Sequence, residues 1–180
     1  MVPQCPTLSS ERLTLRAPMA ADAENVITFL GDPARSPGFG GPLSRDDAWR
    51  WYASMIGHWH LRGYGFWMVD SLDGAPVGFV GLWNPEGWPE AELGWVLFDG
   101  AEGKGYAVEA ALTVRDYAYD VLEMPALTSN IIPSNEPSKA VARRLGATFE
   151  RLYDNPNMGE DELWRHPGPI TAQAQAEVSS

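Results

Sequence analysis

The sequence contains a single cysteine, Cys5, in 180 residues, so it can form no internal disulfide and no cysteine-rich zinc site. Basic residues are also scarce, because 13 Lys and Arg stand against 24 Asp and Glu and give a formal net charge of −11. Nucleic acids and anionic membranes bind basic surfaces, so this balance argues against both as partners. It favours a cationic or amine-bearing partner instead.

Long hydrophobic runs are missing as well. No apolar stretch approaches the ~20 residues that a membrane-spanning helix needs. The first ten residues have neither the basic nor the apolar segment of a secretory signal. We therefore expect a cytoplasmic protein that does not contact a membrane.

Histidines are few and poorly placed for a metal ion. His58 and His60 are two positions apart, so on a helix they point in nearly opposite directions and cannot share a metal. His166 is isolated in the sequence. We expect no metal site.

The chain has the length of one domain and shows no internal repeat. We expect a loose N-terminus over residues 1–9 and a single domain over residues 10–166. Residues 167–180 lack hydrophobic periodicity and are expected to form a flexible tail.

The order of polar and apolar residues predicts a mixed α/β fold. Gly, Pro and Asp-Gly breaks separate the elements, and Ser44 is placed to cap the second helix. Strands are expected at 12–16, 66–71, 76–83, 90–99, 126–132, 148–153 and 162–166, and helices at 20–30, 44–61, 103–122 and 137–145. The resulting order is β-αα-βββ-α-β-α-ββ, in which the strand–helix–strand unit at about 90–132 should be right-handed and parallel.

A glycine-containing segment, EGKGYA at residues 102–107, connects an expected strand to an expected helix. We call it the glycine loop. Free backbone N–H groups and the helix dipole make such a junction suited to a phosphate or diphosphate, and the two glycines allow close approach. A tight turn without a ligand is the alternative. Phe98 and Val108 stand where the P-loop and the dinucleotide-binding fingerprint, respectively, need glycine or another small residue.

Further motifs surround the glycine loop in a fixed order. They are SERLTLR at 10–16, VG and the following strand at 77–82, AELGW at 91–95, NEPS at 135–138 and LWRH at 163–166. Together with GKGYAVEA at 103–110, they resemble the GNAT superfamily of acyl-CoA-dependent N-acetyltransferases over nearly the whole chain. The resemblance is closest to the branch of ribosomal-protein N-terminal acetyltransferases.

The resemblance implies a splayed, mostly antiparallel sheet with one parallel pair, and acetyl-CoA bound in the gap between the fourth and fifth strands. Backbone groups of residues 95–97 would pair with the pantetheine arm, amides of the glycine loop would hold the diphosphate, and Asn135 would bind pantetheine. The residues implied in acetyl-CoA binding are Trp95, Val96, Leu97, Glu102, Gly103, Lys104, Gly105, Tyr106, Ala107, Asn135 and Ser138. The chain departs from the family at Glu102, where Arg or Gln is usual, and at Ala142, where many members carry a tyrosine acid.

Acetyl transfer to an amine needs a base, a donor to the oxyanion and an acid for the leaving thiolate. Glu92 is the candidate base, and Glu90, on the same face by strand alternation, is the alternative; either could instead be a solvated carboxylate. Ser138 is the candidate acid, although a serine at the start of a helix is usually a cap. The backbone N–H of Val96 or Leu97 is the candidate oxyanion donor.

Two clusters of side chains have two interpretations each. Most of the eight tryptophans lie between residues 49 and 95, where they form core or line an amine pocket. Basic residues gather towards the C-terminus, where they form a solvated face or bind the 3′-phosphate of CoA. These basic residues are Lys139, Arg143, Arg144 and Arg151.

Three functions remain open at this stage. The protein acetylates a protein N-terminus or peptide, or it acetylates a small amine, or it binds acyl-CoA as a regulatory module without turnover. Aromatic residues in the closing strands also make a homodimer an expectation.

Overall fold

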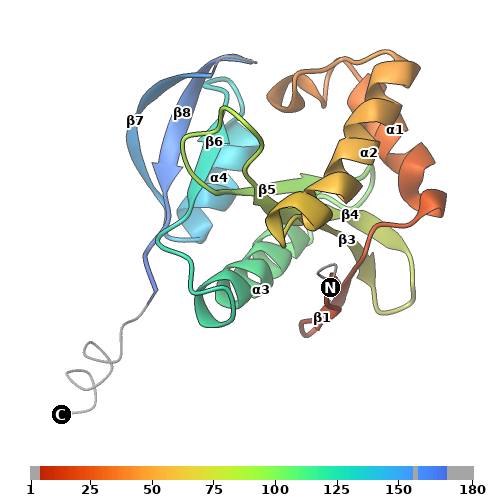
Figure 1. Cartoon of the computed structure of the whole chain (residues 1–180), viewed down its shortest axis with the longest axis horizontal. Helices are drawn as coiled ribbons and strands as arrows, with labels where there is room; N and C mark the ends of the chain where they lie inside the picture. The colour runs from red at the N-terminus through yellow and green to blue at the C-terminus, as the bar shows by residue number, and fades with distance from the viewer. Residues whose placement is uncertain (1–4, 156–157, 170–180) are drawn as a thin grey trace.

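The strands form one sheet of eight, in the order β1-β2-β3-β4-β5-β6-β8-β7 (Figure 1). We describe it from a computed structural model, which covers residues 5–155 and 158–169. Neighbouring strands are antiparallel except β5 and β6, which are parallel. The expected mixed α/β fold with one parallel pair is confirmed.

The elements follow the expected order, with one additional short strand at the start. The strands are β1 (Leu8–Ser9), β2 (Leu13–Arg16), β3 (Phe66–Ser71), β4 (Pro76–Trp83), β5 (Glu92–Leu97), β6 (Thr128–Ile131), β7 (Thr148–Asn155) and β8 (Gly159–Arg165). The helices are α1 (Ala23–Gly31), α2 (Arg45–Arg62), α3 (Tyr106–Asp120) and α4 (Glu136–Arg144), with 3-10 turns at Ala20–Asp22 and Pro37–Phe39. Ser44 caps α2 as expected, by accepting a hydrogen bond from the Asp47 N–H. None of the helices in the described ranges is long and apolar enough to cross a membrane.

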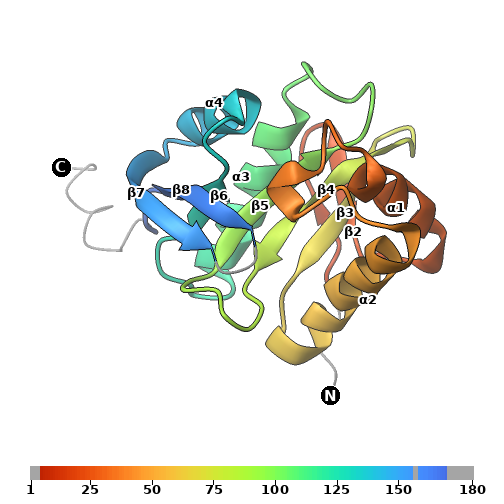
Figure 2. The same cartoon turned by 90° about the horizontal axis from the view of Figure 1, so that it is seen from above.

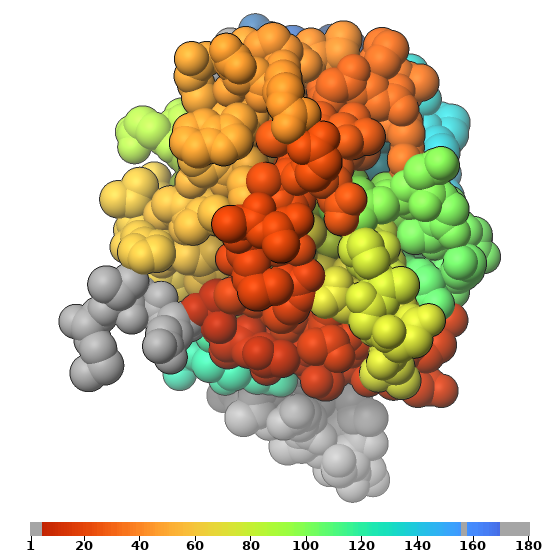
Figure 3. Space-filling view, turned by 90° about the vertical axis from the view of Figure 1, so that its right-hand side faces the viewer, coloured from red at the N-terminus to blue at the C-terminus, as the bar shows by residue number. Residues whose placement is uncertain are grey.

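Helices cover both faces of the sheet (Figure 2). Successive strand residues point to opposite faces, so Phe66 and Met68 of β3 pack in the cluster formed with α1 and α2, whereas Trp67 and Val69 pack in the cluster that contains α3. All four side chains are buried. Figure 3 views the α1 and α2 side, where these helices lie above the red N-terminal segment.

The sheet opens between its two parallel strands. The register between β5 and β6 consists of the pair Glu92 and Thr128. One residue further along β5, the Leu93 carbonyl accepts a hydrogen bond from the side chain of Ser129, at 2.6 Å, instead of from a backbone N–H. The two strands therefore separate beyond this point, which is the splay that the resemblance implies.

The ends of the domain differ from the expectation. Residues 1–9 were expected to be loose, yet Leu8 and Ser9 pair with β2, because the edge of β2 is open and Leu8 packs on the core. The Trp67 indole also donates to the Pro6 carbonyl, at 2.7 Å. At the other end, the Tyr119 hydroxyl donates to the carbonyl of Pro167, the first residue of the expected tail. The rest of these expectations, for residues 1–4 and 170–180, lies outside the described residues.

Candidate active site

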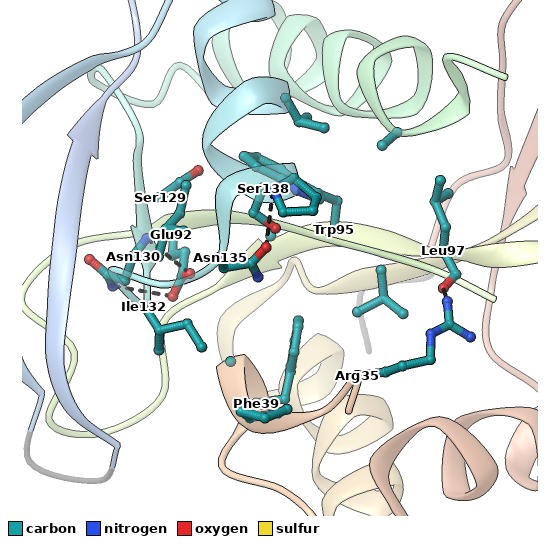
Figure 4. A pocket seen from close by; sticks show the side chains of 18 of the residues that line it. Arg35, Phe39, Glu92, Trp95, Leu97, Ser129, Asn130, Ile132, Asn135 and Ser138 are labelled. Carbon is teal, nitrogen blue, oxygen red and sulfur yellow. Dashed lines mark hydrogen bonds between the residues drawn. The ribbon is translucent and has the colours of Figure 1, made fainter. Parts of the chain in front are cut away.

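A cavity of about 550 Å³ lies where β5 and β6 separate. It is lined by these two strands, by the start of α4 and by the segment that links α1 to α2 (Figure 4). Glu92 and Asn130 lie at one end, Arg35 and Leu97 lie at the other, and Ser138 lies between them. A carboxyl group and an open strand edge therefore face the same cavity.

Alternation along β5 decides which backbone groups face the opening. The Phe98 N–H donates to the Val77 carbonyl of β4, so the backbone groups of Val96, two residues earlier, also point to β4. Those of Trp95 and Leu97 point the other way, towards the opening. The expectation that the Val96 backbone pairs with pantetheine or donates to the oxyanion therefore needs correction, and Trp95 and Leu97 remain.

Glu92 is held in place by three donors. The Trp88 indole donates to its carboxyl at 2.7 Å, and the backbone and side-chain amides of Asn130 donate at 3.2 and 3.3 Å. Burial raises the pKa of Glu92 to about 7 against the effect of these donors, and the nearby Asp161 carboxylate adds to the rise. Near neutral pH, Glu92 therefore occurs in both protonation states, as suits a group that takes up a proton.

Glu90, the alternative base, lies outside β5 and does not line the cavity. Both of its carboxyl oxygens accept from Arg165, at 2.5 and 2.9 Å, and this hydrogen bonding lowers the pKa of Glu90. Strand alternation does not extend to Glu90, because the chain enters β5 only at Glu92. The geometry therefore favours Glu92 over Glu90 as the base.

The glycine loop turns tightly into α3. Gly103 and Gly105 have φ of 75° and 80°, in the left-handed region that favours glycine. Gly105 is the N-cap of α3, and no side chain caps the helix. The first N–H groups of α3 are thus free of a side-chain partner, which is what an anion needs. Within the loop, Glu102 and Ala107 line the cavity, whereas Gly103, Lys104, Gly105 and Tyr106 form the outer turn.

A clamp from the turn between β1 and β2 fixes the outside of the glycine loop, and the sequence gives no signal for it. The Arg12 guanidinium donates to the Lys104 carbonyl at 3.0 Å and pairs with Glu109 of α3. Glu109 also accepts from the Ser10 hydroxyl and from the Arg12 backbone N–H. The loop is therefore held in one shape from the side opposite the cavity.

Asn135 and Ser138 share the first turn of α4. The Asn135 side-chain oxygen accepts from the Ser138 N–H at 3.0 Å, so Asn135, not Ser138, is the helix cap. Both residues line the cavity. The Ser138 hydroxyl is thus not needed as the cap, and the Asn135 amide nitrogen has no hydrogen-bond partner among the described residues.

Replacement of Asn135 separates its two roles. We expect Asn135→Asp to keep the cap and to leave the free energy of unfolding within about 0.5 kcal/mol of the wild type. The same variant loses the amide donor, so we expect about fivefold weaker acetyl-CoA binding in calorimetry. Asn135→Ala should lose both, with about 1 kcal/mol less stability. Wild-type acetyl-CoA affinity in Asn135→Asp would show that the side chain does not bind pantetheine.

Aromatic rings line part of the cavity. Trp51, Trp83, Trp88 and Phe39 face it, whereas Trp59 and Trp67 are buried in the core and Trp49 is exposed on α2. Trp51 and Trp83 stack at 5.7 Å between ring centroids, and His58 stacks on Trp83 from behind at 4.5 Å. The tryptophans therefore divide between the core and the lining of the cavity, and the amine pocket stays a prediction.

A buried Ser129–His166 pair supports the splay and was not expected from the sequence. Ser129 gives its one proton to the Leu93 carbonyl, so the His166 Nε2–H donates to the serine oxygen at 2.9 Å. Burial lowers the pKa of His166 to about 4, which keeps the imidazole neutral at physiological pH. No group of three His, Cys, Asp or Glu side chains among the described residues is arranged to hold a metal ion.

The expected basic cluster is dispersed. Lys139 is buried and pairs with Glu136 and Glu162, so it is not free for a phosphate. Arg143 stacks on Trp164 and Arg151 pairs weakly with Glu150. Arg144 lies with Gly105 and Arg12 in a shallow groove outside the glycine loop, and it remains the candidate for the 3′-phosphate.

The edge strand β7 exposes hydrophobic side chains. Phe149 and Leu152 are 52% and 54% exposed. The homodimer stays a prediction, with this strand as its expected contact.

A family model described as "Acetyltransferase (GNAT) domain" matches residues 12–148. The chain belongs to the GNAT family. An acetyltransferase structure from Agrobacterium tumefaciens is 39% identical, covers 91% of this chain and 95% of its own, and superposes with a TM-score of 0.84. The GNAT fold thus rests on a substantial sequence match.

Two curated relatives match more weakly. FsC-acetyl coenzyme A-N(2)-transacetylase of Aspergillus fumigatus is 28% identical over 176 residues, 87% of this chain and 73% of that protein. Uncharacterized N-acetyltransferase YnaD of Bacillus subtilis is 26% identical over 88 residues, 49% of this chain, and the match spans about half (52%) of that relative. Two structures of the same fold, at 18% and 20% identity, hold coenzyme A.

Proposed function

We propose that this GNAT protein is an N-acetyltransferase that moves the acetyl group of acetyl-CoA to a primary amine, with Glu92 as the general base. The observation that carries the proposal is the position of Glu92. It is a carboxyl group with a pKa of about 7, fixed by three N–H donors, in the cavity that the open edge of β5 also lines.

The open edge of β5 suits the pantetheine arm and the thioester. Trp95 and Leu97 direct backbone groups towards the opening, where the amides of pantetheine can continue the strand ladder. The N–H of Trp95 or Leu97 then donates to the thioester oxygen as negative charge develops on it. At the far end, the uncapped N-terminus of α3 and the glycine loop hold the diphosphate.

The reaction needs the acceptor amine in its neutral form. Glu92 takes a proton from the amine, directly or through a water molecule, and the amine nitrogen attacks the thioester carbon. The tetrahedral intermediate collapses as the carbon–sulfur bond breaks, and the extra proton on the nitrogen passes to the CoA thiolate through the Ser138 hydroxyl or water, which gives a proton to the sulfur and takes one from the nitrogen. Ser138 is suited to this role because Asn135 provides the helix cap in its place.

The acceptor end favours an amine with a hydrophobic or aromatic body. Trp51, Trp83, Trp88 and Phe39 offer ring faces that attract a cation and pack on carbon chains. A net charge of −11 also favours the approach of a cationic amine. Both a small amine and a peptide N-terminus with a hydrophobic first side chain fit this description.

Binding of acyl-CoA without turnover is the second candidate. It is favoured by Ala142, which stands where many relatives carry a tyrosine acid and is fully buried. Protonation of the thiolate then depends on Ser138 or water alone.

Steady-state release of CoA thiol with a panel of acceptors separates these candidates. We expect turnover above the rate of acetyl-CoA hydrolysis with at least one primary amine that has an aromatic or long aliphatic body. Mass spectrometry should find one acetyl group on the acceptor nitrogen. Tight acetyl-CoA binding with no turnover across small amines and peptides would contradict the proposal and favour the regulatory module.

A further inference from the structure

Arg35 reaches from the helix side of the molecule to the track expected for acetyl-CoA. It follows α1, in the segment that leads to α2, and its guanidinium donates to the Leu97 carbonyl at 2.8 Å (Figure 4). The same nitrogen pairs with the Glu102 carboxylate of the glycine loop. One side chain therefore joins the end of β5 to the start of the loop.

The positive charge of Arg35 stands among carboxyl groups in the cavity. Among the described residues that line the cavity, Arg35 is the one Lys or Arg, whereas Glu92 and Glu102 contribute carboxyl groups. A diphosphate in the adjacent loop would meet the Glu102 carboxylate, and like charges at short range repel. A guanidinium beside that carboxylate offsets the repulsion and itself binds phosphate with fixed, paired donors.

The Arg35 guanidinium has unused hydrogen-bond donors. Its Nη2 makes the contacts with Leu97 and Glu102, while its Nη1 and Nε make no hydrogen bond to any described residue. The Arg35 side chain also keeps 26% of its surface exposed. It can thus turn towards a phosphate without first breaking a buried network.

We propose that Arg35 is a binding residue for the diphosphate of acetyl-CoA and that it exchanges the Leu97 carbonyl for the phosphate oxygens when acetyl-CoA binds. The exchange frees the Leu97 carbonyl for an amide of the pantetheine arm. The Glu102 carboxylate adds negative charge to the glycine loop. Arg35 offsets it with a positive charge that comes from the segment between α1 and α2. The inference rests on the placement of acetyl-CoA along β5 given under the proposed function.

The competing explanation is that Arg35 forms a fixed ion pair that only shapes the loop. Acetyl donors with and without a diphosphate distinguish this structural role from diphosphate binding. S-acetylpantetheine carries the thioester and the pantetheine amides but no diphosphate. We expect Arg35→Ala to weaken acetyl-CoA binding about fivefold in calorimetry. We expect the same variant to bind S-acetylpantetheine as well as the wild type or better, because the Leu97 carbonyl is then open. A purely structural role would weaken both ligands together.

Two further variants complete the experiment. Arg45→Ala is the matched control, since Arg45 forms an exposed ion pair with Glu24 away from the cavity, and it should leave both affinities unchanged. Glu102→Gln removes the carboxylate that pairs with Arg35 and leaves Arg35 itself in place. Acetyl-CoA should then bind about twofold to threefold tighter, the size of effect expected for loss of a weak exposed ion pair. This second variant keeps the test valid if Arg35→Ala does not fold.

The outcomes are distinct. Equal weakening of acetyl-CoA and S-acetylpantetheine in Arg35→Ala, or no change in either, would overturn the role of Arg35. Because the readout is a dissociation constant, it does not depend on turnover. An error in the placement of acetyl-CoA itself would appear separately, as wild-type affinity in a variant of the glycine loop that leaves Arg35 intact.

Discussion

Glu92→Gln should lower kcat by about 10²–10⁴-fold at neutral pH, the usual range for loss of a general base. Gln keeps the shape of the side chain and can accept from Trp88, but it cannot take a proton from the amine. Acetyl-CoA affinity should hardly change, because the contacts proposed for acetyl-CoA come from backbone groups further along β5, from the glycine loop and from Asn135. Steady-state thiol release and calorimetry measure the two quantities separately.

Glu90→Gln is the matched control for this variant. Glu90 pairs with Arg165 outside the cavity, so its loss should affect stability slightly and leave kcat within about twofold of the wild type, as for a surface ion pair. A crippled Glu90→Gln beside an active Glu92→Gln would reverse the choice of base. If neither variant loses activity, the amine loses its proton before it binds, and catalysis rests on proximity and oxyanion stabilisation.

The stability of Glu92→Gln provides an independent check on the raised pKa. The pKa of Glu92 is about 7 in the folded protein, above its ordinary value of 4.5, so the folded state binds more protons between these limits. The contribution of Glu92 to wild-type stability is therefore full below pH 4.5 and is lost as the pH rises through 7. The melting temperature of Glu92→Gln should rise relative to the wild type across this window and stay level above it.

Gly105→Val should weaken acetyl-CoA binding at least tenfold, which corresponds to about 1.4 kcal/mol. At a φ of 80°, a branched residue is strained, so the substitution distorts the turn whose N–H groups are proposed to hold the diphosphate at the N-terminus of α3. An ideal Cβ here lies 3.5 Å from the Arg12 guanidinium, an ordinary contact, so the loss of affinity should come from the strained turn. Calorimetry with acetyl-CoA measures the effect.

Gly74→Val is the control for backbone strain alone. Gly74 has a φ of 82° in the β3–β4 turn, and an added Cβ there meets no atom within 4 Å. It should reduce stability and leave acetyl-CoA affinity intact. Wild-type affinity in Gly105→Val would show that the diphosphate does not lie at the glycine loop.

The sequence predicted the regular parts of the fold well, for identifiable reasons. The bounds of β3 and β4 agree with the expectation, because Gly65, the Asp73-Gly74 turn and Asn84 bracket two runs of apolar residues. Strand β1 was missed because two residues carry no periodicity. In the candidate site, Glu92 was identified, but alternation alone could not separate it from Glu90, since the difference lies in where the strand begins and in Arg165.

The remaining contacts of the site join residues that are far apart in the chain. Arg35 and Leu97 are separated by 62 positions, and Ser129 and His166 by 37. No local pattern encodes such pairs, because each depends on how the helices and strands pack. The direction of the Val96 backbone likewise depends on the register with β4, which a motif does not specify.

The pH dependence of kcat/KM, measured with an acceptor whose amine pKa lies above about 9, tests the central claim most directly. This quantity reports the ionisation of the free enzyme. For the wild type, we predict an inflection near pH 7, where Glu92 loses its proton. In Glu92→Gln, the inflection should be absent, and the rate should rise with pH only as the amine itself deprotonates. The same inflection near pH 7 in both proteins would contradict the assignment of Glu92 as the base.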